Sequence, residues 1–379
     1  MTIEPLVSPD EFFGLDGMTH LCAGGEAPWL KRQLDVYERF AELKSSSYDG
    51  REAIFDHGEN CRKKIGKLWG VEPHRVSFLP TAADGMGLIA RGLDWRPGDN
   101  IVTTNLEFPS VAYAWKDVAN KMGVEVRLVS HRNWRVHEED LLDNVDERTR
   151  VLAVSQVSFY TGQNLNLKLL WDNIKNSTTL FAVDSTHASG ALHVPADSTD
   201  LCVSSSYKWL LATHGVAPCY LSEKIENQIR PTCFGWHNLQ VWPPQGAERQ
   251  LKVEELGMPL KFEPGNSAMI VVMFLEKSLD LLLEVGTDKI QNHNRTLSEK
   301  VNLGLRDLGL ELISPLDNVS RSGNTCFLSD DARSVSAGLA EKKILTWGEY
   351  GRVRVSTHLY NSGDDVTRLI NGLSEMRLS

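Results

Sequence analysis

Two charged residues follow strand-like runs at places where their types could do chemistry. Asp184 ends the apolar run TLFAVD, and Lys208 comes just after LCVSSSY. A desolvated lysine has a lowered pKa and can act as a nucleophile or a base, and a buried carboxylate can pair with a cationic nitrogen. Taken alone, each residue is more often structural, Asp184 as a turn cap and Lys208 as an amine that reaches to water. The prediction therefore rests on their combination.

A third feature is a candidate anion site earlier in the chain. The stretch FLPTAADGMG predicts a strand, a short turn and a helix that opens at Thr81, Ala82, Ala83 and Asp84. Small residues at a helix N-terminus let backbone N–H groups approach a phosphate, whose charge the helix dipole favours. Thr81 as a simple N-cap is the more common role, so this feature gains weight only beside Asp184 and Lys208.

One cofactor chemistry uses all three features together. Pyridoxal phosphate requires an anion site, an acidic residue that keeps its pyridine nitrogen protonated, and a lysine that forms a Schiff base. The protonated ring withdraws electrons from the substrate Cα, and the released lysine moves protons at that carbon. We therefore predict a pyridoxal phosphate enzyme that acts at the Cα of an α-amino acid through a Schiff base at Lys208.

Alternating strands and helices could bring these residues together. Strand-like runs occupy about residues 75–80, 100–105, 124–130, 150–157, 179–184, 201–206 and 216–222. Helix-length segments separate most of them, which favours a mainly parallel sheet covered on both faces. The link from 206 to 216 is too short for a crossover helix, so we expect the last strand to run antiparallel. The predicted fold is α/β with a mixed sheet, and ligands bind at the carboxyl ends of strands in such sheets.

The composition of the sequence changes after about residue 235. FGWHNLQVWPPQGAERQ is rich in Pro, Gly and aromatic residues and indicates an irregular connection. Helices are predicted near 267–284 and 287–309, followed by short strands at TCFLS and RVRVS, each with a helix after it. We predict a large domain of residues 16–245 and a smaller α+β domain made of residues 1–15 and 246–379.

Composition narrows the classes of partner. The 379-residue chain has 41% hydrophobic and 24% charged residues and a net charge of −10, which disfavours a nucleic-acid binder. The acidic start lacks the pattern of a signal peptide, and no apolar run approaches a membrane span, so a cytoplasmic location is expected. Six scattered cysteines without a CxxC pair suit reduced thiols better than a metal site. A small-molecule partner is the expectation, without metal, nucleic acid or membrane.

The Asp-to-Lys pattern resembles that of a known family. FAVDSTHASG, followed about twenty residues later by SSSYKWL, is similar to the core signature of the class V aminotransferases of fold type I. Cysteine desulfurases, isopenicillin N epimerase and kynureninase belong to the same group. The similarity runs from about residue 18 to the C-terminus. It implies a mainly parallel, mixed seven-stranded sheet in a large domain, a smaller C-terminal domain, and pyridoxal 5'-phosphate as cofactor.

The resemblance also implies roles around the cofactor. Lys208 would carry the Schiff base and Asp184 would pair with the pyridine nitrogen, which makes both catalytic. His187 would lie near the phenolic oxygen, and Phe108 in NLEFPS would stack on the ring. The expected phosphate contacts are Thr81, Ala82, Ala83, Ser205, Tyr207 and, from a partner subunit, Asn266 in FEPGNSA.

Substrate contacts are implied in the same way. Arg354 in GRVRVSTHLYN would hold the substrate carboxylate with two parallel hydrogen bonds. Gly24 and Gly25 in HLCAGGEAP would let a loop close over the substrate. Further candidates on the substrate side, each more often a packing residue, are His20, Tyr160, Trp236, His237 and Trp347.

Several positions depart from the family pattern. Tyr207 replaces the histidine common before the lysine in desulfurases, Ala83 stands where a hydroxyl residue often occurs, and Asn266 replaces the customary threonine. EKKILTWGEYGRVRVS contains no cysteine, although desulfurases place their nucleophile before the arginine segment. Phe108 can stack but cannot move protons as the usual histidine does. Persulfide transfer is therefore not expected.

Three reactions share the same first proton transfer, from Cα to Lys208. Transamination is favoured because it needs no additional acid and no pocket for a leaving group. The alternatives are β-elimination of the C–S lyase type and Cα epimerisation. A catalytically silent regulatory module that binds the cofactor is a further alternative, although the retention of Lys208 and Arg354 opposes it. A homodimer with shared active sites is expected, because the aromatic stretch FGWHNLQVW and FEPGNSA suit an interface.

Overall fold

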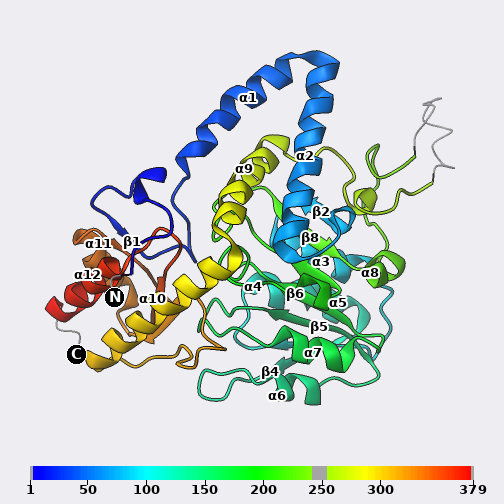
Figure 1. The fold of residues 1–379 in the computed structure, drawn as a ribbon. Helices are drawn as coiled ribbons and strands as arrows, with labels where there is room; N and C mark the ends of the chain where they lie inside the picture. The colour runs from blue at the N-terminus through cyan, green and yellow to red at the C-terminus, as the bar shows by residue number, and fades with distance from the viewer. Residues whose placement is uncertain (1–2, 241–253, 377–379) are drawn as a thin grey trace.

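The structure is a computed structural model that describes residues 3–240 and 254–376. Figure 1 shows a large sheet with its helices on one side of the molecule and the C-terminal helices on the other. The hairpin of α1 (Leu34–Ser45) and α2 (Ser47–Trp69) projects away from this body. Within the described residues, no helix is both long enough and apolar enough to cross a bilayer.

The large sheet has seven strands, as the sequence predicts. Their order across the sheet is β2 (Val76–Leu79), β8 (Ala217–Leu221), β7 (Leu201–Val203), β6 (Leu180–Asp184), β5 (Thr149–Ser155), β3 (Asn100–Thr104) and β4 (Glu125–Val129). All neighbours are parallel except β8, which is antiparallel to both β2 and β7. The expected mixed sheet and the antiparallel last strand are confirmed. Strands such as β3 and β6 are buried throughout, which explains their continuous apolar runs.

Short helices connect or follow these strands. Those between strands are α3 (Ala82–Gly92), α4 (Pro109–Ala112), α5 (Lys116–Met122), α6 (Glu138–Asp143) and α7 (Leu167–Ile174), and α8 (Glu223–Gln228) follows β8. The α3 helix begins with a capping box, in which Thr81 and Asp84 each accept a hydrogen bond from the other's backbone N–H. The predicted helix start at Thr81 is therefore correct.

Strand β7 is shorter than predicted. It ends at Val203, whereas the sequence indicated a strand to residue 206. Ser206 Oγ instead donates to the carbonyl oxygens of Thr213 and Val216, and the Ser205 N–H donates to Thr186 Oγ1. These bonds take the place of ladder bonds, so the chain leaves the sheet at Val203.

Helix α9 (Met269–Val285) packs along α2, and α10 (Thr287–Asp307) follows it. A buried ion pair ties α2 to the segment before α9, because Arg62 donates two bonds to Glu263 at 2.9 and 3.0 Å. Glu263 also accepts from the Phe78 N–H at 2.8 Å. Both charged groups of this ion pair thus have hydrogen-bond partners inside the protein.

The C-terminal part contains a second sheet. Strand β12 (Arg352–Ser356) lies between β11 (Trp347–Glu349) and β9 (Asn324–Leu328), antiparallel to both. Helices α11 (Ala332–Glu341) and α12 (Gly363–Glu375) pack nearby. Strands β1 (Thr19–His20) and β10 (Ile344–Leu345) form a separate parallel pair. The limits of the two domains stay a prediction.

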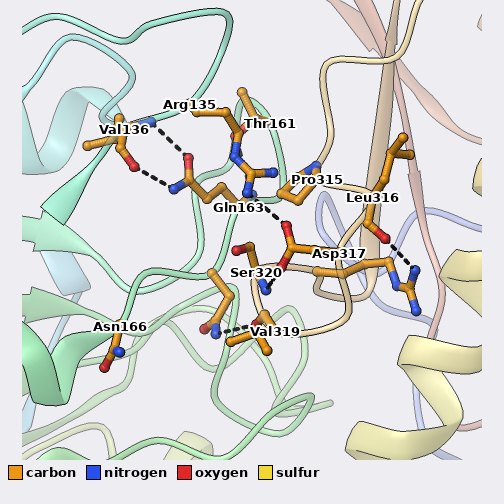
Figure 2. Close-up of polar contacts among 12 residues, drawn as sticks. Arg135, Val136, Thr161, Gln163, Asn166, Pro315, Leu316, Asp317, Val319 and Ser320 are labelled. Atoms are coloured by element: carbon orange, nitrogen blue, oxygen red, sulfur yellow. Dashed lines mark hydrogen bonds and ion pairs between the residues drawn. The ribbon is translucent and has the colours of Figure 1, made fainter.

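Figure 2 shows how a C-terminal loop meets the large sheet's connections. Arg135 forms an ion pair with Asp317 at 2.8 Å, and Asp317 also accepts from the Ser320 N–H. Gln163 holds Val136 through two bonds, one to its N–H and one to its carbonyl oxygen. The segments around residues 135, 163 and 317 are therefore fixed to one another.

Candidate active site

The pocket at the carboxyl ends of the central strands contains most of the residues predicted to bind the cofactor. Asp184 is the last residue of β6, and Lys208 lies beyond the end of β7, the next strand in the sheet. The pocket is lined by Ala82, Phe108, Ser110, Ser155, Val157, Phe159, Asp184, Thr186, His187, Ser205, Tyr207 and Lys208. Residues from five separate stretches of sequence therefore meet at one place.

Lys208 is buried without a carboxylate partner among the described residues. The residue is 7% exposed, and its Nζ lies 3.3 Å from His187 Nε2. Burial lowers the pKa of this amine to about 8, and the nearby positive charge of Arg354 acts in the same direction, against Asp184. About half of the lysine is consequently a neutral nucleophile near pH 8.

Asp184 is also buried, and its carboxylate keeps free hydrogen-bonding capacity. Its Oδ1 accepts from the Thr186 N–H at 2.8 Å. Burial raises its pKa, while the bonds from Thr186 and the charge of Lys208 oppose that rise. A buried carboxylate without an ion pair in the described structure is suited to a cationic ligand nitrogen.

A chain of hydrogen bonds leads from the C-terminal sheet to Lys208. Ser356 on β12 donates to Asn324 Oδ1 at 2.7 Å, and Asn324 Nδ2 lies 3.0 Å from His187 Nδ1. With the amide in this orientation, Nδ1 accepts and the neutral ring carries its proton on Nε2, towards Lys208. Burial and then the charge of Lys208 lower the His187 pKa well below its usual value. The network therefore favours a neutral lysine.

The start of α3 faces the same pocket through Ala82. The Thr81 hydroxyl donates to Asp84 Oδ2 and accepts from the Asp84 N–H, so its side chain is used within the helix cap. Ala83 points to a different hollow, beside α5. Backbone N–H groups of the first turn have no intrahelical partner and are the groups that suit a phosphate here, together with the neighbouring Ser205 and Tyr207.

Two phenylalanine rings close the pocket. Phe108 precedes α4 and its ring centroid lies 5.4 Å from Lys208 Nζ. Phe159 meets Phe108 edge to face, with 5.1 Å between ring centroids. The two rings thus form an apolar wall of the pocket.

Arg354, Gly24 and Gly25 lie together beside the pocket. Arg354 is 3% exposed, and its Nη1 donates to the Phe159 carbonyl oxygen at 3.2 Å, while its buried Nε has no partner. A Cβ at Gly24 would stand 3.2 Å from that Nε. At Gly25 it would stand 2.6 Å from the Trp347 ring. The loop can approach the arginine closely only because both positions are glycines.

The other candidates lie elsewhere in the chain. Asn266 is exposed and faces a hollow formed with α1 and α2, away from Lys208. Trp236 and His237 pack near Arg51 and Phe55. His20 is bonded to the Tyr360 hydroxyl, and burial lowers its pKa to about 4. Trp347 lies over Arg354, with 5.8 Å from guanidinium to ring. Tyr160 lies next to Phe159, outside the cofactor pocket.

Sequence reasoning missed three polar residues around the pocket. Glu107 accepts bonds from the Ser155 N–H and hydroxyl, and burial raises its pKa to about 7. Asn324 and Ser356 orient His187 as described above. No motif links Asn324 to His187, but the alternation of RVRVS could have placed Ser356 on the same strand face as Arg354.

Comparison with known proteins decides the family. The family model described as aminotransferase class-V matches residues 29–369. The chain belongs to the class-V aminotransferase family. Among similar curated proteins, this class-V chain is 22% identical to the uncharacterized aminotransferase YcbU of Bacillus subtilis, over 89% of both. It is 27% identical to a probable cysteine desulfurase of Pseudomonas putida, over 84% of this chain and 82% of the relative.

Solved structures confirm the architecture. A cysteine desulfurase from Thermococcus onnurineus superimposes with a TM-score of 0.89, at 18% identity and over 99% of both chains. The class-V protein therefore has the fold type I architecture that the sequence resemblance implied. It is a pyridoxal phosphate-dependent enzyme.

The residues of the pocket fit this cofactor. The buried Lys208 and Asp184 both keep free bonding capacity, as a covalent attachment and a protonated ring nitrogen require. Phe108 offers a ring for stacking, and α3 offers backbone donors for the phosphate. His187, with its proton on Nε2, suits the phenolic oxygen. The role of each individual side chain in holding the cofactor stays a prediction.

Proposed function

We propose that this enzyme is an aminotransferase. The observation that carries the proposal is the apolar wall that Phe108 and Phe159 form in the pocket. Neither ring can give or take a proton. Among the described residues that line the pocket, the titratable groups are Asp184, His187, Tyr207 and Lys208. One lysine that takes a proton and returns it suffices for transamination, whereas inversion at Cα needs a second acid on the other face.

Each residue then has a task that its surroundings support. When bound, pyridoxal phosphate draws electron density from the Cα of the amino acid. Asp184 holds the positive charge at the ring nitrogen, because a buried carboxylate is a strong partner for it. Lys208 takes the Cα proton, since its lowered pKa increases the fraction of neutral amine that can act as a base. Arg354 binds the substrate carboxylate with its unpartnered edge.

A lyase that cleaves a C–S bond is the second candidate. Curated relatives that include the Pseudomonas putida protein are named probable cysteine desulfurases. Persulfide transfer is disfavoured for this chain because the segment before Arg354 has no cysteine. Cys22 is a thiol near Arg354, and its pKa is raised chiefly by burial, so it is a weak nucleophile. A simple β-elimination needs no such thiol and remains the alternative.

Product analysis separates these reactions. Holoenzyme is mixed with a panel of amino acids, and products are followed by mass spectrometry, with Lys208→Ala as the blank. Pyridoxamine phosphate together with a keto acid is the expected result. Pyruvate and ammonia without pyridoxamine phosphate would replace the proposal with the lyase, and deuterium uptake with inversion at Cα would replace it with the epimerase. If the parent protein binds the cofactor but transforms none of the amino acids, it is a regulatory module.

We also propose a homodimer that shares its active sites. Asn266 is exposed beside Tyr48 and Arg51, where it cannot meet the pocket of its own chain. The hollow they line has a volume of about 560 Å³ and is rich in aromatic and apolar side chains, as the core of an interface is. Sedimentation analysis should give twice the mass of 42.4 kDa. A fully active monomer would contradict shared sites. The cytoplasmic location stays a prediction.

A further inference from the structure

A second cavity shares part of its lining with the cofactor pocket. Its volume is about 540 Å³, and Phe108 and Phe159 line both cavities. Its lining also includes the rings of Tyr113, His131, Trp134, Tyr160 and Tyr350. A cavity of this size with mainly aromatic and apolar walls is typical of sites for small ligands.

Its outer wall is held rigidly. The Trp134 ring stacks between His131 at 4.7 Å and Tyr160 at 5.6 Å, centroid to centroid, with interplanar angles of 10° and 14°. Trp134 has φ +63, a conformation that a bulky residue adopts only when its surroundings impose it. The flanking Val136 is fixed by Gln163, and Arg135 by Asp317 (Figure 2). The indole therefore does not depend on a ligand for its position.

The floor is equally well fixed. Tyr160 donates its hydroxyl hydrogen to the Tyr350 carbonyl oxygen at 2.8 Å. The Arg352 guanidinium lies 4.0 Å from the centre of the Tyr160 ring and donates to the backbone carbonyl oxygens of residues 159 and 160. Tyr350 and Gly351 form the positive-φ turn between β11 and β12, so the Tyr350 ring is carried on a tight hairpin.

The cavity is linked to the carboxylate site through one residue. Arg354 donates to the Phe159 carbonyl oxygen at 3.2 Å, while the Phe159 ring forms part of both cavities. The carboxylate site, the cofactor pocket and the aromatic cavity therefore adjoin one another at Phe159.

We propose that this cavity receives the substrate side chain, and that the substrate is an α-amino acid with an aromatic side chain. The proposal rests on the aminotransferase function above. Ring faces offer stacking and edge-to-face contacts to a planar side chain. Several polar atoms of the lining are already engaged: Glu107 is bonded to Ser155, His131 Nδ1 accepts from the Trp134 N–H, and Asn105 Oδ1 accepts from the His131 N–H. A cationic side chain would meet the buried charge of Arg352 behind Tyr160.

The test measures binding without turnover. The holoenzyme is titrated by calorimetry with 3-phenylpropionate and with propionate, which share the carboxylate and differ in the ring. We expect phenylpropionate to bind at least about 10-fold more tightly, and Trp134→Ala to remove most of that difference. Trp171→Ala is the matched control, because Trp171 packs in the same hydrophobic cluster but lies outside the cavity. Equal binding of both acids by the parent, or an equal loss in both tryptophan variants, would overturn the proposal.

A second variant tests the proposal independently of any folding defect in Trp134→Ala. Tyr350→Gly removes an exposed ring, and glycine accepts its φ of +55 without strain. It should weaken phenylpropionate binding and leave propionate binding unchanged; loss of both would also overturn the proposal. The amino-acid panel keeps the two proposals apart. Tight phenylpropionate binding combined with lyase products would refute only the aminotransferase, and keto acids formed only from small amino acids would refute only the aromatic substrate.

Discussion

Arg352 and Arg354 lie on one face of β12 and have opposite surroundings. Both are buried, at 1% and 3% exposure. Arg352 donates to the carbonyl oxygens of Phe159, Tyr160 and Glu349 and stacks on the Tyr160 ring. Arg354 donates to one carbonyl oxygen, and its Nε has no partner. A buried charge that the protein satisfies supports structure, and one that it leaves open is prepared for a ligand.

The same distinction separates two other groups of buried charges. Arg62 and Glu263 are bonded to each other and to backbone groups. Asp184 and Lys208 form no ion pair with each other in the described structure. The first group should therefore govern stability and the second group activity, and the following changes test that division.

Removal of the lysine amine should have the largest effect. We expect Lys208→Ala to lower turnover by at least about 10⁴-fold, because it removes both the covalent attachment and the base. The free energy of unfolding of the apoenzyme should change by less than about 1 kcal/mol, since no ion pair is broken. Turnover assays and urea titration measure the two quantities. A large loss of apoenzyme stability would show that Lys208 belongs to the structural group.

The Arg62–Glu263 pair should behave in the reverse way. Arg62→Met leaves Glu263 buried without its cation, which costs about 3–5 kcal/mol. The double variant with Glu263→Gln should regain part of that loss. Urea unfolding measures the stabilities, and kcat at a temperature where all variants are folded should stay close to that of the parent. A selective loss of kcat would contradict the division.

The two arginines of β12 provide the most closely matched test. Arg354→Gln should reduce kcat/KM by about 100-fold through loss of charge-assisted bonds to the substrate carboxylate, with a small change in melting temperature. Arg352→Gln should lower the melting temperature, because buried carbonyl oxygens lose their donors. If both variants lost kcat/KM equally and melted alike, the contrast between them would be unsupported.

Substitution of Asn324 tests how the hydrogen-bond network around Lys208 sets the pKa of that lysine. Asn324→Asp places a carboxylate against His187 Nδ1, which moves the ring proton to that atom and leaves Nε2 free to accept from a protonated Lys208. The pKa of Lys208, about 8 in the parent, should then rise by on the order of one unit. Because the neutral amine attacks the cofactor, the midpoint of the rate of apoenzyme reconstitution against pH should rise with it. Asn324→Leu is the uncharged control, and an unchanged midpoint in Asn324→Asp would argue against this network.

Glu107 should show the smallest effect. Folding raises its pKa to about 7, so its contribution to stability is full below its unfolded pKa of about 4.3 and is lost as the pH rises through 7. Glu107→Gln does not titrate. Its melting temperature relative to the parent should therefore improve between pH 6 and pH 8.5, as calorimetry can measure. A constant difference across that range would show that Glu107 does not titrate there.

The sequence was sufficient for most of the large sheet. Continuous apolar runs gave its strands, and the short link between 206 and 216 correctly indicated the antiparallel β8. Those signals are local, because burial on both faces leaves a direct record in composition. The predicted end of β7 was wrong because bonds from the Ser205 backbone N–H to the Thr186 hydroxyl and from the Ser206 hydroxyl replace the ladder. Serine has no fixed preference that reveals such a choice.

The candidate site was only partly predictable. Asp184, Lys208, His187, Ser205 and Tyr207 are near one another in sequence and lie in one pocket. Asn324 reaches His187 across a large sequence separation, and the aromatic cavity depends on the turn conformations of Trp134 and Tyr350. Contacts of that kind depend on tertiary packing, for which a single sequence contains no periodic signal.

Gly24 constrains which sequences this protein can reach by single substitutions. A methyl group on its Cα would stand 2.7 Å from Ser356 Oγ, 2.8 Å from Asn324 Oδ1 and 3.2 Å from Arg354 Nε. A larger residue at position 24 is therefore tolerated only after substitutions at positions 324 and 356 have made room for it. The order of substitutions thus decides which are tolerated, so a library that varies position 24 alone should yield almost no active clones, whereas one that varies all three positions together should yield some.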